Sequence, residues 1–88
     1  MNIDTVWARI RKLEGHDFET KRGLPFRYEI SGDIFLPSRT KYKIAKTNFE
    51  KALEHTPMDG PGQISNLVRG SAYVWAVLHD ARIRRSDW

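Results

Sequence analysis

Three histidines are the first side chains in this chain that could bind a metal or transfer a proton. His16, His55 and His79 lie far apart in the sequence, and no two of them have the close spacing of a zinc ligand pair. The chain has no cysteine to complete a thiolate site. We therefore predict no metal site and no cofactor, and we interpret the histidines as surface or capping residues.

A serine, a histidine and an aspartate near the C-terminal end have the side-chain types of a nucleophilic triad. Ser71, His79 and Asp80 fall in or beside one apolar segment. If this segment is a helix, Ser71 and His79 lie roughly 12 Å apart along its axis, too far for a hydrogen bond between nucleophile and base. We interpret Ser71 as the helix N-cap and predict that the chain is not an enzyme.

Glu19 and Lys21 alternate onto one face of a predicted strand, and they resemble the Glu-x-Lys half of metal-dependent restriction-type nucleases. That resemblance implies a carboxylate that holds Mg²⁺ and a lysine that stabilises charge on phosphate. It covers three residues, and the acid that precedes it, Asp4, starts a predicted helix rather than a strand. A magnesium-dependent nuclease is therefore the third of our functional hypotheses.

The clearest chemical signal is a basic segment in the middle of the chain. Residues 36–46 carry four basic side chains and no acidic one, within a net charge of +4. Lys and Arg can neutralise phosphates, hydroxyls can hydrogen-bond them, and free amides at a helix start favour an anion. We predict non-enzymatic binding to DNA or RNA by Arg39, Thr40, Lys41, Lys43, Lys46, Thr47, Arg69 and Ser71.

A protein-interaction domain is the alternative hypothesis. Basic domains with protein partners are common, so charge alone does not decide between the two. In this alternative the chain is an accessory or antitoxin-like subunit, or a homodimer joined through an exposed Trp7 or Tyr42. The sequence predicts no small-molecule substrate, and it leaves DNA versus RNA open.

The elements that would position these residues follow from hydrophobic periodicity. Apolar residues at three- and four-residue steps predict a helix from Asp4 to Glu14, capped by Asn2 or Asp4. Alternation predicts strands over 18–20, 26–30 and 34–36 and an edge strand or extended arm over 41–44. Thr47 and Glu50 match a capping box. Residues 64–68 suggest a helical turn, and residues 72–78 are apolar on every side, which favours a buried helix and leaves a strand possible.

Together these elements predict a single α+β domain over residues 1–88, with a frayed tail over 84–88. The expected order is α-β-β-β-α-α, with a three-stranded antiparallel meander packed against about three helices. A chain of 88 residues can build one core. No apolar stretch reaches the roughly 18 residues that span a bilayer, and the start resembles no signal peptide. We therefore expect a cytoplasmic protein without membrane contact.

Several short motifs along the chain resemble a small bacterial domain found in genomic islands and in restriction-type or other mobile-element contexts. The resemblance is carried by Phe18-x-Thr20-x-x-Gly23-x-Pro25-Phe26-x-Tyr28, Pro37-Ser38-Arg39, the segment from Thr47 to Glu50, and Arg69-Gly70-Ser71-x-Tyr73-Val74-Trp75. It implies a bacterial domain and favours a nucleic-acid partner. It implies no particular activity, cofactor or functional residue.

Overall fold

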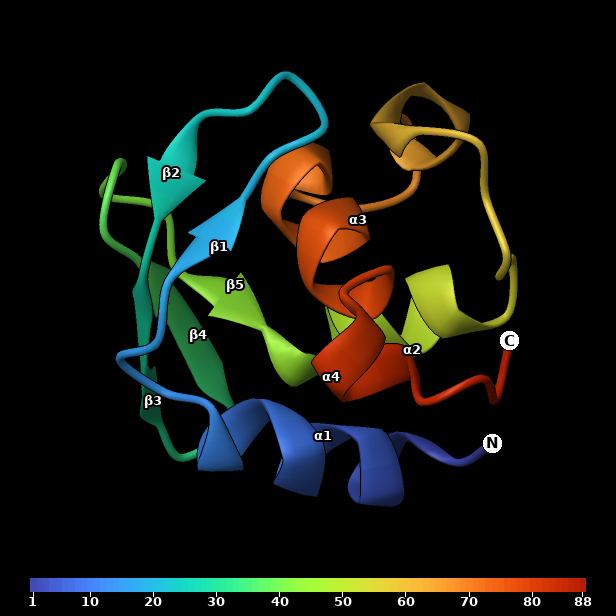
Figure 1. Cartoon of the computed structure of the whole chain (residues 1–88), viewed down its shortest axis with the longest axis horizontal. Helices are drawn as coiled ribbons and strands as arrows, with labels where there is room; N and C mark the ends of the chain where they lie inside the picture. The colour runs from blue at the N-terminus through green and yellow to red at the C-terminus, as the bar shows by residue number, and fades with distance from the viewer.

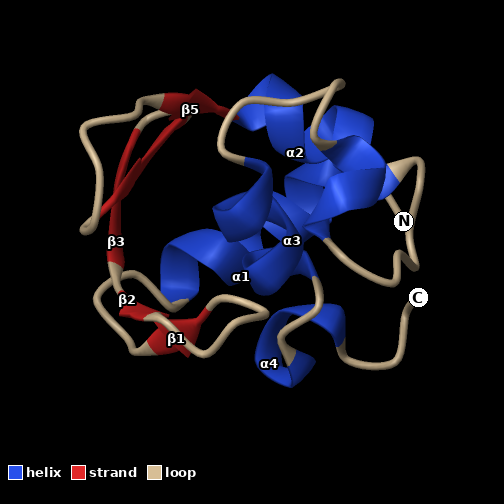
Figure 2. Ribbon diagram, turned by 90° about the horizontal axis from the view of Figure 1, so that it is seen from above, coloured by secondary structure: helices blue, strands red, loops and turns tan.

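The computed structural model describes residues 1–88 as one helix, five short strands and three further helices, with a 3₁₀ turn between the second and third helices (Figure 1). The bounds are α1 (Ile3–Lys12), β1 (Phe18–Glu19), β2 (Pro25–Phe26), β3 (Tyr28–Ser31), β4 (Ile34–Pro37), β5 (Ile44–Ala45), α2 (Lys46–Leu53), η1 (Pro61–Ile64), α3 (Ser71–Leu78) and α4 (Ala81–Arg84). Figure 2 shows the strands along one side and the helices on the other, which confirms the predicted α+β class. None of the helices has the length and apolar character needed to cross a membrane.

Helix α1 starts at a side-chain cap and buries one face. The Asn2 side chain accepts a hydrogen bond from the N–H of Thr5 at 2.9 Å, so Asn2 is the cap rather than Asp4. The predicted start and end were each close to the observed bounds. The buried face consists of Val6, Trp7 and Ile10, which recur at helical spacing.

The strands form the predicted three-stranded antiparallel meander, but from β3, β4 and β5, and the first predicted strand lies in a separate two-stranded sheet. β1 pairs with β2 in a hairpin, and β3, β4 and β5 form the three-stranded sheet in that order. The predicted strand over 26–30 is divided at Arg27, because the N–H of Arg27 donates to the Ser38 hydroxyl at 2.9 Å instead of to a strand carbonyl. The predicted segment 41–44 pairs only at Ile44, which lies opposite Phe35.

Aromatic side chains connect the two layers. The Phe35 ring lies 4.5 Å from the Tyr28 ring and 5.0 Å from the Phe49 ring, measured between centroids. These three side chains are almost completely buried. The Tyr28 hydroxyl donates to the Ile10 carbonyl at 2.6 Å, and burial raises the pKa of Tyr28. Sheet and α1 are therefore joined by a buried hydrogen bond as well as by apolar contact.

The apolar segment of the C-terminal third is a helix, α3, as first expected. The predicted helical turn over 64–68 is also present, since the N–H of Val68 donates to the Ile64 carbonyl at 3.1 Å. It follows directly on η1, where Pro61 fits the first position of a helical turn. The tail that was predicted to fray makes contacts with the rest of the chain. The Trp88 indole donates to the Leu78 carbonyl at 2.7 Å, and Asp87 forms an ion pair with Arg9 at 2.6 Å, so contacts with α1 and α3 hold the tail in place.

Candidate functional site

The eight residues predicted to bind nucleic acid lie in three places. Arg39, Thr40, Lys41 and Lys43 lie in the loop between β4 and β5, Lys46 and Thr47 open α2, and Arg69 and Ser71 flank the turn into α3. In Figure 1 the loop is the green segment at the upper left that leads from β4 to β5. Its three basic side chains and that of Arg69 are exposed.

The β4–β5 loop, residues 38–43, is attached to the sheet at its first residues. The N–H of Ser38 donates to the Arg27 carbonyl at 2.8 Å, and the Ser38 hydroxyl accepts from the N–H of Arg27. The Arg39 guanidinium reaches the Pro25 carbonyl at 3.3 Å, and the Thr40 hydroxyl accepts from the N–H of Tyr42 at 3.3 Å. The loop therefore has a defined path along the end of the β1–β2 hairpin.

The turn before α3 lies against the end of the same loop. Gly70 has a left-handed backbone with φ of 65°, and a Cβ atom at this position would be 2.4 Å from Cδ1 of Ile44. The N–H of Arg69 donates to the Asn48 side chain at 3.1 Å. These contacts place Arg69 beside the residues that follow Lys43. We call Arg39, Lys41, Lys43 and Arg69 the cationic surface.

Ser71 belongs to this turn but is not the predicted cap. Gly70 occupies the N-cap position without a side-chain hydrogen bond, and Ser71 is the first residue of α3. The left-handed conformation of the turn explains the shift, because glycine adopts it without the steric cost that a serine would meet.

Lys46 and Thr47 are not part of the cationic surface, because carboxylates surround them. Lys46 forms an ion pair with Asp4 at 2.7 Å, and the hydrogen bond to Asp4 is the main cause that raises the pKa of Lys46. Asp33 and Glu50 line the same hollow as Lys46 and Thr47. A phosphate at this helix start would meet three carboxylates, so the structure does not support these two predicted contacts.

The predicted capping box at Thr47 is wrong for a related reason. Helix α2 starts at Lys46, after Ala45, two residues before the start that a Thr47 cap would give, and has no side-chain cap. The N–H of Lys46 donates to the Asp33 carbonyl at 2.8 Å, which continues the pairing of Ala45 with Ile34. The register of β5 therefore sets the start of the helix, and the Thr47 hydroxyl is not needed there.

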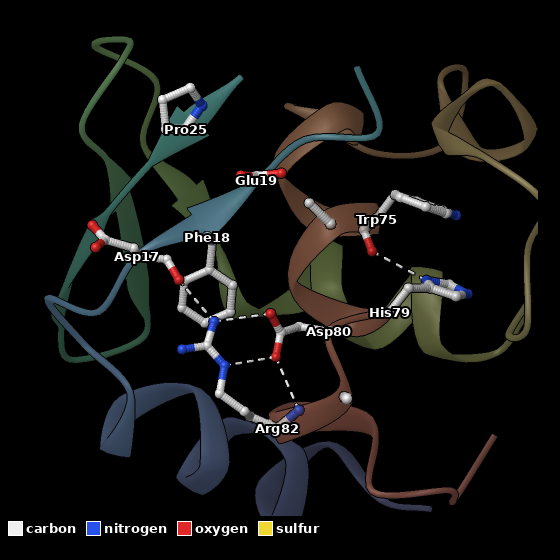
Figure 3. A pocket seen from close by; sticks show the side chains of 10 residues that line it. Asp17, Phe18, Glu19, Pro25, Trp75, His79, Asp80 and Arg82 are labelled. Carbon is white, nitrogen blue, oxygen red and sulfur yellow. Dashed lines mark hydrogen bonds and ion pairs between the residues drawn. The ribbon is translucent and has the colours of Figure 1, made fainter. Parts of the chain in front are cut away.

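The largest hollow, about 790 Å³, lies on another face, between β1, α3 and α4 (Figure 3). Three of its charged groups form ion pairs, Asp80 with Arg82 and Asp17 with Arg27. Burial disfavours the ionised form of Asp80, but hydrogen bonds and charge from Arg82 outweigh it and hold the pKa of Asp80 below its usual value. The hydrogen bond from Arg27, at 2.6 Å, likewise lowers the pKa of Asp17. Arg82 also lies over the Phe18 ring, 4.3 Å from its centroid. These contacts fasten α4 to β1.

His79 lines this hollow and has a structural role. Its Nε2 accepts from the N–H of Met58 at 3.0 Å, which leaves Nδ1 to donate to the Trp75 carbonyl at 3.1 Å (Figure 3). The Trp75 ring stacks on the imidazole at 4.8 Å and donates to the Met58 carbonyl at 3.0 Å. Both ring nitrogens are occupied, so the neutral imidazole joins α3 to the loop around Met58.

We expect the free energy of unfolding to fall as the pH is lowered through the histidine range, and His79 to contribute to the loss. Burial lowers the pKa of His79, so the unfolded chain binds this proton more readily than the folded chain. The contribution is complete above about pH 6.5, the ordinary histidine pKa, and is lost as the pH falls from there towards the lowered value. Urea unfolding between about pH 7.5 and pH 5 should show a weaker pH dependence for His79→Asn. His55→Asn, at an exposed position, is the control, and equal slopes for both variants would contradict this role.

The pair predicted for a nuclease is not arranged as a motif on one strand. β1 ends at Glu19, and Lys21 lies in the following turn. The Lys21 ammonium reaches the Asp59 carbonyl at 2.5 Å and the face of Trp75 at 5.7 Å from the ring centroid. No group of three or more His, Asp or Glu side chains is placed to hold a metal ion. The strand therefore ends before Lys21, and strand alternation does not place Glu19 and Lys21 on one face.

Comparison with protein-family models, curated proteins and solved structures gives no match to this chain. The resemblance to a mobile-element domain thus stays a prediction, and the function has to be inferred from the chain's own residues.

Proposed function

We propose that this domain is a non-enzymatic nucleic-acid-binding domain that contacts phosphates with the cationic surface. The observation that supports this most is the distribution of ion pairs. The structure has four ion pairs, and their cations are Arg9, Arg27, Lys46 and Arg82. None of the four cationic-surface residues is among them. Their charges remain available to a polyanion, whereas the charges of the four paired cations are already compensated.

The neighbouring side chains favour the same partner. The hydroxyls of Thr40 and Ser71 lie in the same segments and can donate to phosphate oxygens. Glu19 lies opposite Pro25 in the β1–β2 hairpin, and no carboxylate forms an ion pair with a residue of the cationic surface. The cationic surface therefore keeps a positive excess.

A salt titration of oligonucleotide binding tests the proposal. With three to four phosphate contacts, the logarithm of the binding constant should fall with the logarithm of salt concentration with a slope of about −2 to −4. Replacing Lys41 and Lys43 together by Glu should abolish binding at low salt. The double variant Lys12→Glu and Lys51→Glu changes the net charge equally on two exposed helix positions, and it should retain most of the affinity. Absence of binding at low salt, or equal losses in both double variants, would reject the proposal.

Three exposed apolar side chains favour a protein partner as the second candidate. Leu24, Tyr42 and Leu67 are 48%, 50% and 46% exposed and lie outside the helices and strands. Trp7, which the sequence suggested as a dimer contact, is 3% exposed and belongs to the core, so that part of the homodimer hypothesis is wrong. Light scattering over a range of concentrations separates the candidates, because a homodimer held through Tyr42 would dissociate on dilution.

A further inference from the structure

We infer that the nucleic acid bound by the cationic surface is an unpaired strand, with a base stacked on Tyr42. This inference rests on the proposed function and adds the form of the ligand. Tyr42 is half exposed, lies between Lys41 and Lys43, and makes no side-chain hydrogen bond within the chain. An exposed aromatic ring between two free cations offers stacking to a base and charge to the adjoining phosphates.

The loop holds the backbone of Tyr42 at a defined place. Its start is attached to Pro25 of β2 through Arg39 and to Arg27 through Ser38, and the N–H of Tyr42 itself is bound by Thr40. Its end is fixed by Ile44, which is buried, pairs with Phe35 and contacts the turn at Gly70. Because both ends are held, binding requires less ordering of the loop, and more of the stacking energy contributes to affinity.

The contacts of helix α3, Lys46 and Arg9 weaken the case for duplex recognition by a helix. Recognition in the major groove needs an exposed helix with free polar side chains along one face. Helix α3 supplies most of its side chains to the core, and the first cation of α2, Lys46, is paired with Asp4. In α1, Arg9 is bound to Asp87 and to the Ile83 carbonyl. In the loop, the candidate reader is the Tyr42 ring, and a stacking ring can reach a base face only where that base is unpaired.

Fluorescence anisotropy at low salt provides the test, with a labelled 12-nucleotide single strand of mixed sequence, as DNA and as RNA, and the duplex of the same sequence. We expect the wild-type domain to bind the single strand at least about fivefold more tightly than the duplex. Tyr42→Ala should weaken single-strand binding by about fivefold or more, and Tyr42→Phe should retain it, because the ring is kept. Circular dichroism of both variants checks that the fold is intact.

The outcomes separate this inference from the proposed function. If the duplex is bound as tightly as the single strand, or if Tyr42→Ala binds the single strand like the wild type, the inference is wrong. In that case, loss of binding in the Lys41→Glu and Lys43→Glu double variant would still support phosphate contact by the cationic surface. If neither nucleic acid is bound at low salt, both the inference and the proposed function fail.

Discussion

Phe35→Ala is expected to lower the free energy of unfolding by about 3–5 kcal/mol, which is the usual cost of removing a buried aromatic ring. Phe35 is fully buried on the central strand of the β3-β4-β5 sheet. Its ring contacts those of Tyr28 and Phe49, so it links the sheet to α2. A domain of this size has a total stability of roughly 4–13 kcal/mol, and this single truncation would remove a large part of it.

Leu36→Ala is the matched control, because Leu36 is next on the same strand, points to the opposite side and is only partly buried. Chemical denaturation followed by far-ultraviolet circular dichroism measures both variants. We expect the loss for Leu36→Ala to be less than half of that for Phe35→Ala. Comparable losses would show that the core is not centred on the Phe35 ring.

Gly70→Ala is expected to cost about 2–5 kcal/mol, for two separate reasons. The left-handed backbone at this position, with φ of 65°, is unfavourable by about 1–2 kcal/mol for a residue with a Cβ atom. The new methyl group would also lie 2.4 Å from Cδ1 of Ile44. Forcing an extra methyl group into packed surroundings typically costs about 1–3 kcal/mol.

A double-mutant cycle isolates the second reason. Ile44→Val removes the Cδ1 atom and alone should cost about 0.5–1.5 kcal/mol. In the Gly70→Ala background the same change relieves the clash, so the double variant should be more stable than the sum of the single losses predicts. Losses that add to within about 0.5 kcal/mol would show that Gly70 and Ile44 are not in contact.

Local hydrophobic periodicity predicted the elements whose structure depends on residues close to one another in the sequence. The face of α1 and the apolar run of α3 were both found, because each depends on residues three or four positions apart. The predictions failed where contacts between residues far apart in the sequence determine the local structure. The pairing between β5 and β4 moved the start of α2 away from Thr47. In the tail, Asp87 forms an ion pair with Arg9, near the opposite end of the chain. Nothing in the sequence around Asp87 predicts this contact.

Predictions about the candidate site also succeeded where neighbouring residues were sufficient and failed where distant residues make contact. A run of lysines with no acid nearby in the sequence correctly marked an exposed basic loop. The sequence could not show that Lys46 meets Asp4, which lies 42 positions away. It also gave no reason to connect Arg69 with this loop, a connection that depends on Asn48 and on the fit of Gly70 against Ile44. Asn48 and Gly70 are therefore positioning residues found only from the structure.

The carboxylates around Lys46 and the free cations of the loop lie at opposite ends of β4, whose four residues separate them by roughly 10 Å. The sheet consequently has an electric dipole moment along its strands. A polyanion that diffuses towards the molecule exerts a torque on it before any contact forms. This torque turns the β4–β5 loop towards the polyanion. Added salt shortens the reach of this field to about 8 Å at physiological ionic strength. The association rate constant should therefore fall steeply with ionic strength.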